Sequence, residues 1–244
     1  METLKKWLSA YPRAKVLDVA TGSGAFFGLL LEAEASLDDS VGIDCSERAV
    51  AAARGQFAEF PKLHFETMDG ATMSFRDASW DVVSLANSLH HLPNRTKVLR
   101  EMERVLRPGG ILILQEMVAD GLTHSQLSHR KFHHLSAEID RKMGIHHRPT
   151  YPRDAIRSWV RQHSTLEYAE EWILALPKAE KPNQDETDAL FSLMDRVVNR
   201  IVDSQTRAPF AAKAARIRAY IEKNGWDACP EMMIVLKKSI PAPR

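Results

Sequence analysis

The stretch VLDVATGSG, which runs from Val16 to Gly24, is the most informative part of this chain. Its first half is apolar and β-rich, and it stops abruptly at a turn of small residues. Gly22 and Gly24 carry no side chains, so the backbone can turn sharply there and a ligand can approach the main chain. The apolar run AFFGLLL that follows, residues 25–31, is typical of a helix packed on a sheet. The stretch therefore predicts a strand, a ligand-binding turn and a helix.

Further apolar runs continue this pattern through the first half of the chain. They predict strands near residues 40–44, 63–68, 80–86 and 110–117, after a first strand near 15–19. Helical patterns lie between most of these runs, and such alternation is typical of a parallel sheet with helices on both faces. We therefore expect an α/β fold built on a Rossmann-like, mostly parallel, seven-stranded sheet.

The second half of the chain is expected to complete the sheet and to cover the ligand site. Strands near 166–176 and 232–238 are predicted to form an antiparallel, hairpin-like edge. Apolar stripes at helical spacing predict two helices between them, over 185–203 and 209–223. We expect a single domain over residues 1–244, in which two helical insertions form a lid over the acceptor side of the site, residues 119–149 and 177–228.

Composition limits the classes of partner and the compartment. The 33 Lys and Arg residues nearly balance the 32 Asp and Glu residues, so no strong overall field attracts nucleic acid or an anionic membrane. Two cysteines, Cys45 and Cys229, provide no disulfide framework, which suits a reducing compartment. No segment approaches the ~20 apolar residues of a membrane span, and no leader pattern is seen. A cytoplasmic protein without nucleic-acid or membrane partners is expected, and no oligomeric state is assigned.

Acidic residues stand where predicted strands end, the edge at which open parallel sheets bind ligands. Asp44 ends the second strand about 20 residues beyond the glycine turn, where a carboxylate can accept both hydroxyls of a ribose. Asp69, followed by Gly70, can accept from the exocyclic amine of a purine. Asp18 disfavours an anionic pyrophosphate but suits a ligand that carries an ammonium and a sulfonium group.

A nicotinamide dinucleotide would also use a glycine turn and an acidic second strand. However, Phe27 stands where the dinucleotide fingerprint requires glycine or alanine, so close helix–strand contact around a pyrophosphate is poorly supported. The negative charge of Asp18 also disfavours a pyrophosphate. S-adenosylmethionine is therefore the favoured ligand, and an NAD-linked oxidoreductase is the weaker alternative.

Five segments in order resemble the successive motifs of class I S-adenosylmethionine-dependent methyltransferases of the small-molecule branch. They are residues 16–24, 41–44, 68–70, 80–92 and 104–110. The resemblance implies that the methionine moiety, the ribose and the adenine contact the following residues: Asp18, Ala20, Gly22, Gly24, Asp44, Cys45, Asp69, Gly70, Ala86 and Asn87.

By this resemblance, the expected activity is transfer of a methyl group from S-adenosylmethionine to a small-molecule acceptor. Methyl transfer is an in-line displacement that depends more on alignment than on acid–base groups. An alternative from another class is a non-catalytic or regulatory protein that binds S-adenosylmethionine without transferring its methyl group, since a fold alone does not guarantee activity.

Histidines are concentrated on the predicted acceptor side. Six of the ten lie between His124 and His147. His129 and His133 would share a helix face as a metal-ligand pair, but no HExxH motif surrounds them and no carboxylate is obviously placed with them. The sequence therefore assigns no metal site. The histidines can be surface or structural residues, but their place after the fifth predicted strand favours a lining of the acceptor site. The candidate general bases are His133, His134, His147 and Glu116.

Overall fold

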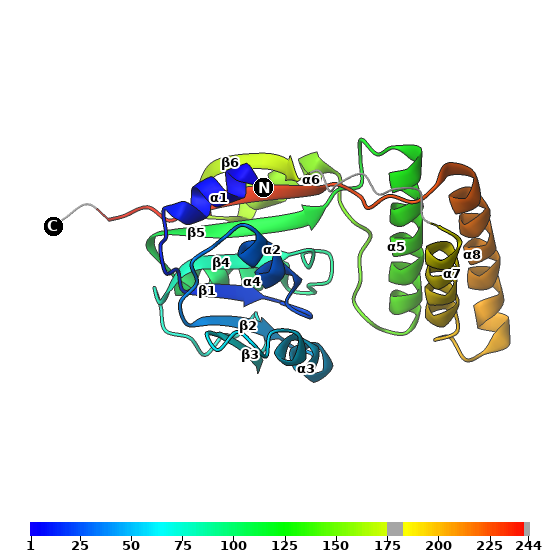
Figure 1. The fold of residues 1–244 in the computed structure, drawn as a ribbon, viewed down its shortest axis with the longest axis horizontal. Helices are drawn as coiled ribbons and strands as arrows, with labels where there is room; N and C mark the ends of the chain where they lie inside the picture. The colour runs from blue at the N-terminus through cyan, green and yellow to red at the C-terminus, as the bar shows by residue number, and fades with distance from the viewer. Residues whose placement is uncertain (175–182, 242–244) are drawn as a thin grey trace.

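The computed structural model describes residues 1–174 and 183–241 (Figure 1). One seven-stranded sheet forms the centre of the molecule. From edge to edge it contains β3 (Leu63–Thr67), β2 (Ser40–Asp44), β1 (Val16–Val19), β4 (Trp80–Ala86), β5 (Leu106–Met117), β7 (Glu231–Lys237) and β6 (Glu167–Leu174). The predicted Rossmann-like sheet is confirmed.

The strand order reverses at β1. This strand pairs in parallel with β2 on one side and with β4 on the other. The chain first moves outward through β2 and β3 and then returns to the opposite side of β1, which opens a crevice between the β1 and β4 ends. In open α/β sheets such a switch point is where ligands bind.

Each face of the sheet has its own apolar core. Against one face pack α4 (Arg95–Val105) and α6 (Arg153–His163), and against the other pack α1 (Glu2–Ser9), α2 (Ala25–Glu32) and α3 (Glu47–Gln56). The alternation of side chains along a strand explains this division: Leu17 and Val19 of β1 face the first core, whereas Val16 faces the second. Helices on both faces are therefore confirmed.

Three helices form a separate layer beyond the strand ends. They are α5 (His124–Lys142), α7 (Gln184–Val198) and α8 (Ser204–Asn224), and in Figure 1 the arrow of β5 points toward α5. Their apolar faces build a third core that includes Leu135, Met194 and Ile217. We call this layer the helical cover. It holds much of the two predicted insertions, although residues 177–182 of the second lie outside the described residues.

The antiparallel edge is confirmed. β7 pairs antiparallel with both β5 and β6, and α7 and α8 lie between β6 and β7 in the chain. The last two residues of the strand predicted at 166–176 lie outside the described part. α8 begins five residues before the predicted start at 209, because Asp203 caps it by accepting a hydrogen bond from the Thr206 amide at 2.7 Å.

β5 also begins earlier than expected. The sequence predicts a strand from about residue 110, but β5 already begins at Leu106 and includes Arg107, Pro108 and Gly109. These residues form an irregularity instead, since the register moves from Trp80↔Leu106 to Val82↔Ile111 and Gly109 has φ 77°. The extra residues are accommodated as a bulge within the β4–β5 pair.

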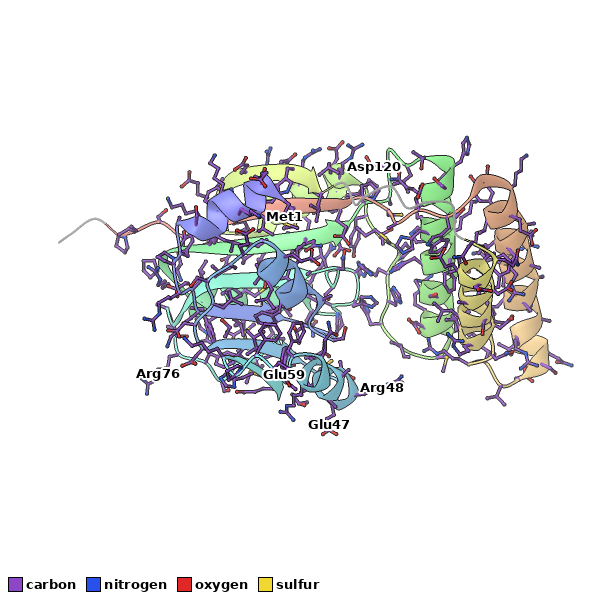
Figure 2. The ribbon with its side chains drawn as sticks, in the orientation of Figure 1. Met1, Glu47, Arg48, Glu59, Arg76 and Asp120 are labelled. Carbon is purple, nitrogen blue, oxygen red and sulfur yellow. The ribbon has the colours of Figure 1, made fainter. Side chains whose placement is uncertain are left out.

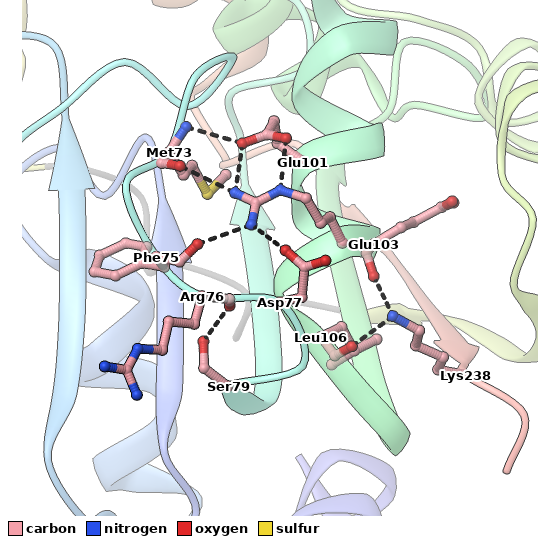
Figure 3. A network of polar contacts seen from close by, with 10 residues as sticks. Met73, Phe75, Arg76, Asp77, Ser79, Glu101, Glu103, Leu106 and Lys238 are labelled. Atoms are coloured by element: carbon pink, nitrogen blue, oxygen red, sulfur yellow. Dashed lines mark hydrogen bonds and ion pairs between the residues drawn. The ribbon is translucent and has the colours of Figure 1, made fainter.

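A network around Arg104 holds the segment that follows Asp69 (Figure 3). The guanidinium of Arg104, on α4, donates to Glu101 and Asp77 and to the carbonyl oxygens of Met73 and Phe75, at 2.7–3.0 Å. Charged hydrogen bonds of this kind are stronger than neutral ones. The segment between β3 and β4 is thereby fixed to α4 at the edge of the ligand crevice.

The connection from the sheet to the helical cover is fixed in a similar way. Asp120, labelled in Figure 2, lies just beyond β5 and accepts hydrogen bonds from the backbone amide of Arg153 at 2.8 Å and from its Nε at 2.9 Å. The chain therefore leaves the sheet and returns to α6 at one place. None of the described helices has both the length and the apolar character needed to cross a lipid bilayer.

Candidate functional site

A cavity of about 590 Å³ lies at the carboxyl ends of β1, β2 and β4, at the switch point of the sheet. Seven of the ten residues predicted to bind the cofactor line it. They come from segments far apart in the sequence, and they are Ala20, Gly22, Asp44, Cys45, Asp69, Gly70 and Asn87. The crossover topology brings them together because parallel strands end at the same edge.

A second cavity of about 390 Å³ adjoins the first. It is lined by Asp18 and Ala86, and it shares Ala20 and Asn87 with the larger cavity. These two shared residues have left-handed backbone conformations, with φ 55° at Ala20 and φ 48° at Asn87. Non-glycine residues adopt this conformation only where the surroundings impose it, and such positions cluster at functional sites. The backbone therefore has an uncommon left-handed conformation at both residues where the two cavities meet.

Polar contacts hold Asn87 in this conformation. The backbone amide of Asn87 donates to the backbone carbonyl of Gln115 at 2.8 Å, and its side-chain Nδ2 donates to Glu231 Oε1 at 2.6 Å. Glu231 also accepts from the side chain of Gln115. Because Gln115 and Glu231 belong to β5 and β7, the antiparallel edge of the sheet supports the floor of the site.

Asp44 joins the ends of β1 and β2. Its Oδ2 accepts a hydrogen bond from the Gly22 amide at 3.0 Å, and its Oδ1 accepts one from the Ser46 amide at 2.9 Å. Each carboxylate oxygen has a second lone-pair site, so Asp44 can still accept from a ligand in the cavity that it lines. Asp69 is more exposed, and its Oδ1 accepts from the Ala71 amide at 2.8 Å.

The glycines of the site have different roles. Gly22 has φ 57°, and a Cβ there would meet no atom within 4 Å, so this turn is open toward the cavity. A Cβ on Gly70 would lie 2.8 Å from Val19 Cγ1, and a Cβ on Gly24 would lie 2.4 Å from Phe57 Cε2. Gly24 lines neither cavity; the structure places it against the ring of Phe57, where it permits close packing of α2 and α3.

This contact predicts a large difference between two glycines of the same segment. Gly24→Ala should destabilise the fold by about 1–3 kcal/mol, because φ 89° and the Phe57 ring both oppose a side chain. Gly28→Ala, inside α2 with open space around its Cα, should be neutral or stabilising by about 0.5–1 kcal/mol. Urea unfolding of both variants measures the difference, and equal stabilities would contradict this account of the turn.

Asp18 is the buried acid of the site. Its side chain is 1% exposed and accepts a hydrogen bond from Ser84 Oγ at 2.7 Å. Burial raises the pKa of Asp18 to about 7, while the hydrogen bond from Ser84 opposes that shift and the charge of Asp44 adds to it. A carboxyl group in this state becomes charged readily when a cation is placed beside it.

Four imidazoles meet beyond the end of β4, where α5 approaches the sheet. His90 and His91 follow β4, His133 lies on α5 and His147 follows α5, and one ring nitrogen of each lies within 4.8 Å of the others. We call these residues the histidine cluster. His91 also lines the large cavity, so the cluster adjoins the predicted cofactor site. Burial and the neighbouring imidazoles lower the pKa of His133 to about 2, which keeps its ring neutral.

The candidate bases are not all brought together. His133 and His147 join the cluster, whereas His134 Nε2 lies 2.9 Å from Thr150 Oγ1, beside a different cavity on the surface of α5 and α8. Glu116 is fully buried; it accepts from the Leu89 amide at 2.9 Å and contacts His90 Nδ1 at 2.5 Å, and it lines neither cavity at the strand ends. His90 and His91 were not among the predicted site residues, although the HH pair shortly after β4 was the available signal.

Comparisons with known proteins agree with this geometry. A family model described as a methyltransferase domain matches residues 17–114. Demethylmenaquinone methyltransferase of Staphylococcus aureus is 32% identical over 102 residues, 42% of this chain and 42% of the relative. The 2-phytyl-1,4-naphthoquinone methyltransferase of Synechococcus elongatus is 30% identical over 115 residues, 46% of this chain and 49% of the relative. The chain spans less than half the length of these curated relatives.

Solved structures share the whole fold at low sequence identity. A methyltransferase candidate of Haloferax volcanii, in complex with the activator Trm112, has a TM-score of 0.63 at 16% identity, covering 100% of this chain and 90% of that one. The [4+2]-cyclase SpnF has a TM-score of 0.61 at 18% identity, covering 98% of this chain and 80% of that one. At such identities the likeness shows the fold alone. Residues 17–114 therefore match a methyltransferase domain, and the chain as a whole shares its fold with these solved structures.

Proposed function

We propose that this protein binds S-adenosylmethionine and transfers its methyl group to a small-molecule acceptor. The observation that carries the proposal is the large cavity, in which Asp44, Asp69 and the Gly22 turn converge at the switch point of the sheet. An adenosyl group requires such an arrangement, with a carboxylate for the ribose hydroxyls and an open backbone turn beside it.

The residues of both cavities fit the two ends of this cofactor. We assign the ribose to Asp44, the adenine to Cys45, Asp69 and Gly70, and the cationic methionine end to Asp18, with Ala20, Ala86 and Asn87 forming the floor. When bound, the cofactor supplies a methyl group on a sulfonium that already carries its leaving group. The protein then has to hold the acceptor atom in line and exclude water.

The acceptor is proposed to lie between the large cavity and the helical cover. His91 belongs to the cavity wall, and His133 and His147 approach it from α5 and the loop after it. The named activities of the quinone methyltransferases support a small-molecule acceptor, and the balanced charge of the chain favours neither nucleic acid nor a membrane surface. With its two free cysteines, the protein is proposed to act in the cytoplasm as one domain, covered by 119–149 and 177–228.

A ligand screen tests the cofactor. S-adenosylmethionine and S-adenosylhomocysteine should each raise the melting temperature, because a ligand at one hundred times its dissociation constant stabilises the native state by about 2.7 kcal/mol. NAD should have no effect. A shift with NAD alone would contradict the proposal. Mass spectrometry of cell extract incubated with protein and cofactor should then reveal a metabolite that gains one methyl group.

The acceptor-side histidines are tested by turnover. His133→Ala and His147→Ala should each lower turnover tenfold or more while cofactor affinity is unchanged, because both rings lie beyond the cofactor cavity and face the acceptor side. His134→Ala should have a smaller effect, since His134 bonds to Thr150 outside the cluster. Full activity in the first two variants would place the acceptor contacts elsewhere.

The second candidate function is a protein that binds the cofactor without methyl transfer. SpnF, named as a [4+2]-cyclase, has the same fold, which favours keeping this candidate. Cofactor binding with no methylated product in any extract would support it over the first.

A further inference from the structure

The histidine cluster connects two layers of the molecule. His90 and His91 belong to the sheet layer, beyond the end of β4, whereas His133 lies on α5 of the helical cover and His147 lies in the loop after α5. In Figure 2, side chains from α5 and from the loops at the strand ends extend toward one another across this region. The ring centroids of His91 and His147 are 4.0 Å apart, and those of His90 and His133 are 4.9 Å apart.

Two carboxylates, the fully buried Glu116 and the partly buried Asp140, fix how these rings present their nitrogens. His90 Nδ1 lies 2.5 Å from Glu116 Oε1, and His147 Nδ1 lies 2.6 Å from Asp140 Oδ2. Asp140 is itself held by Arg200 at 2.7 Å. An ionised carboxylate only accepts hydrogen bonds, so each Nδ1 carries the proton and each Nε2 presents a lone pair. Histidine ligands of metal ions are commonly oriented by a carboxylate in this manner.

Three other ring nitrogens of the cluster have no hydrogen-bond donor beside them among the described residues. His90 Nε2, His147 Nε2 and His133 Nδ1 are buried, and none has a hydrogen-bond partner among the described residues. Leaving buried polar atoms unpaired is unfavourable, and lone pairs that converge on one point repel each other. A cation at that point removes both penalties, because imidazole nitrogen is a good ligand for Zn²⁺ and related ions.

We propose that the histidine cluster binds a divalent transition-metal ion, for which Zn²⁺ is the reference case. His90, His133 and His147 would be the ligands, and His91, the exposed member beside the large cavity, the fourth. A tetrahedral site with Zn–N of about 2.0–2.1 Å needs nitrogens about 3.3 Å apart. The 4.8 Å spread of the cluster therefore has to contract by up to about 1.5 Å when the ion binds.

The ion would fasten the helical cover to the end of β4, next to the cofactor cavity. This position departs from the sequence prediction of no metal, since that prediction considered the His129–His133 pair and not a set from both layers. His129 Nδ1 in fact accepts from the Cys229 amide at 3.0 Å. The link to the acceptor rests on the proposed function, whereas metal binding itself does not.

Metal content of the full chain gives the first test. Protein freed of metal with a chelator should bind one Zn²⁺ per chain in a titration against a competing chelator dye, without cofactor or acceptor present. Co²⁺ should bind at the same site and give the intense visible absorption of a tetrahedral complex. A methyltransferase that binds no metal would overturn this inference alone; one equivalent of metal without any methyl transfer would overturn only the proposed function.

Variants show whether the cluster is the site. His133→Ala should weaken Zn²⁺ binding at least one-hundredfold, and His134→Ala, its neighbour on α5, should leave affinity and stoichiometry unchanged. His133→Cys should retain Co²⁺ and add the charge-transfer band of a thiolate ligand, which a merely structural role would not produce. Asp140→Asn should weaken binding about 10–100-fold through loss of the orienting carboxylate. Unchanged affinity in His133→Ala, or an unchanged spectrum in His133→Cys, would overturn the assignment.

Discussion

Asp44→Ala is expected to weaken the binding of S-adenosylmethionine about 10²–10⁴-fold. Asp44 lines the large cavity and, in the proposed complex, accepts two hydroxyl groups of the ribose. A hydrogen bond to a charged acceptor contributes about 1.5–3 kcal/mol, so the loss of two gives this range. Isothermal titration calorimetry with S-adenosylmethionine and S-adenosylhomocysteine measures the change for both ligands.

Two controls separate this effect from damage to the fold. Asp44 also holds the amides of Gly22 and Ser46, so the isosteric Asp44→Asn, which keeps one oxygen acceptor, should fold and show an intermediate loss. Glu47→Ala removes a neighbouring negative charge at the start of α3. Because Glu47 lines neither cavity, the affinity of this variant for S-adenosylmethionine should match that of the wild type. Equal affinities in all four proteins would move the ribose site away from β2.

Cofactor affinity is expected to depend on pH through Asp18. In the free protein, burial holds the pKa of Asp18 at about 7, so the carboxyl is largely protonated below that pH. In the proposed complex it is ionised, because a cationic group of the ligand lies beside it. Binding below pH 7 therefore releases a proton, and affinity should fall about tenfold for each pH unit below 7 and level off above it.

Asp18→Asn isolates this group. The amide keeps the shape of the protonated acid and a contact with Ser84, but it cannot ionise. Its affinity for S-adenosylmethionine should be about 10–150-fold lower than that of the wild type at pH 8, which corresponds to about 1.5–3 kcal/mol, and nearly equal at pH 5.5. Calorimetry in buffers of different ionisation enthalpy counts the released proton. A wild-type affinity that is the same at pH 5.5 and pH 8 would contradict the role of Asp18.

The fold of the first half follows from local sequence alone. β1, β2, β3 and β4 have nearly the predicted bounds. The three inner strands are buried apolar runs, whereas Leu63 and Phe65 of the edge strand β3 alternate with exposed residues, and both patterns are visible locally. The predicted start of β5 was wrong because it depends on pairing with a distant strand. A Pro-Gly-Gly sequence signals a turn locally, and only pairing with β4 shows that the strand passes through it as a bulge.

Most residues that line the large cavity could likewise be predicted to lie together, since they stand at or just after strand ends and all parallel strands end at one edge. Asp44 and Asn87 are examples, and both line the large cavity. Gly24 shows the limit of this reasoning. Its place in the turn is predictable, but its contact with Phe57 depends on how α3 packs against α2.

The histidine cluster was decided by tertiary packing. Helical periodicity predicts that α5 exists, yet it does not say which of two adjacent histidines faces the sheet. Packing of α5 against α7 and α8 turns His133 toward His90 and turns His134 toward Thr150. Local sequence thus determined the strands and the residues at their ends, because these depend on neighbours in the chain. The histidine cluster required the tertiary structure, because its members come together only when two separate apolar cores pack against each other.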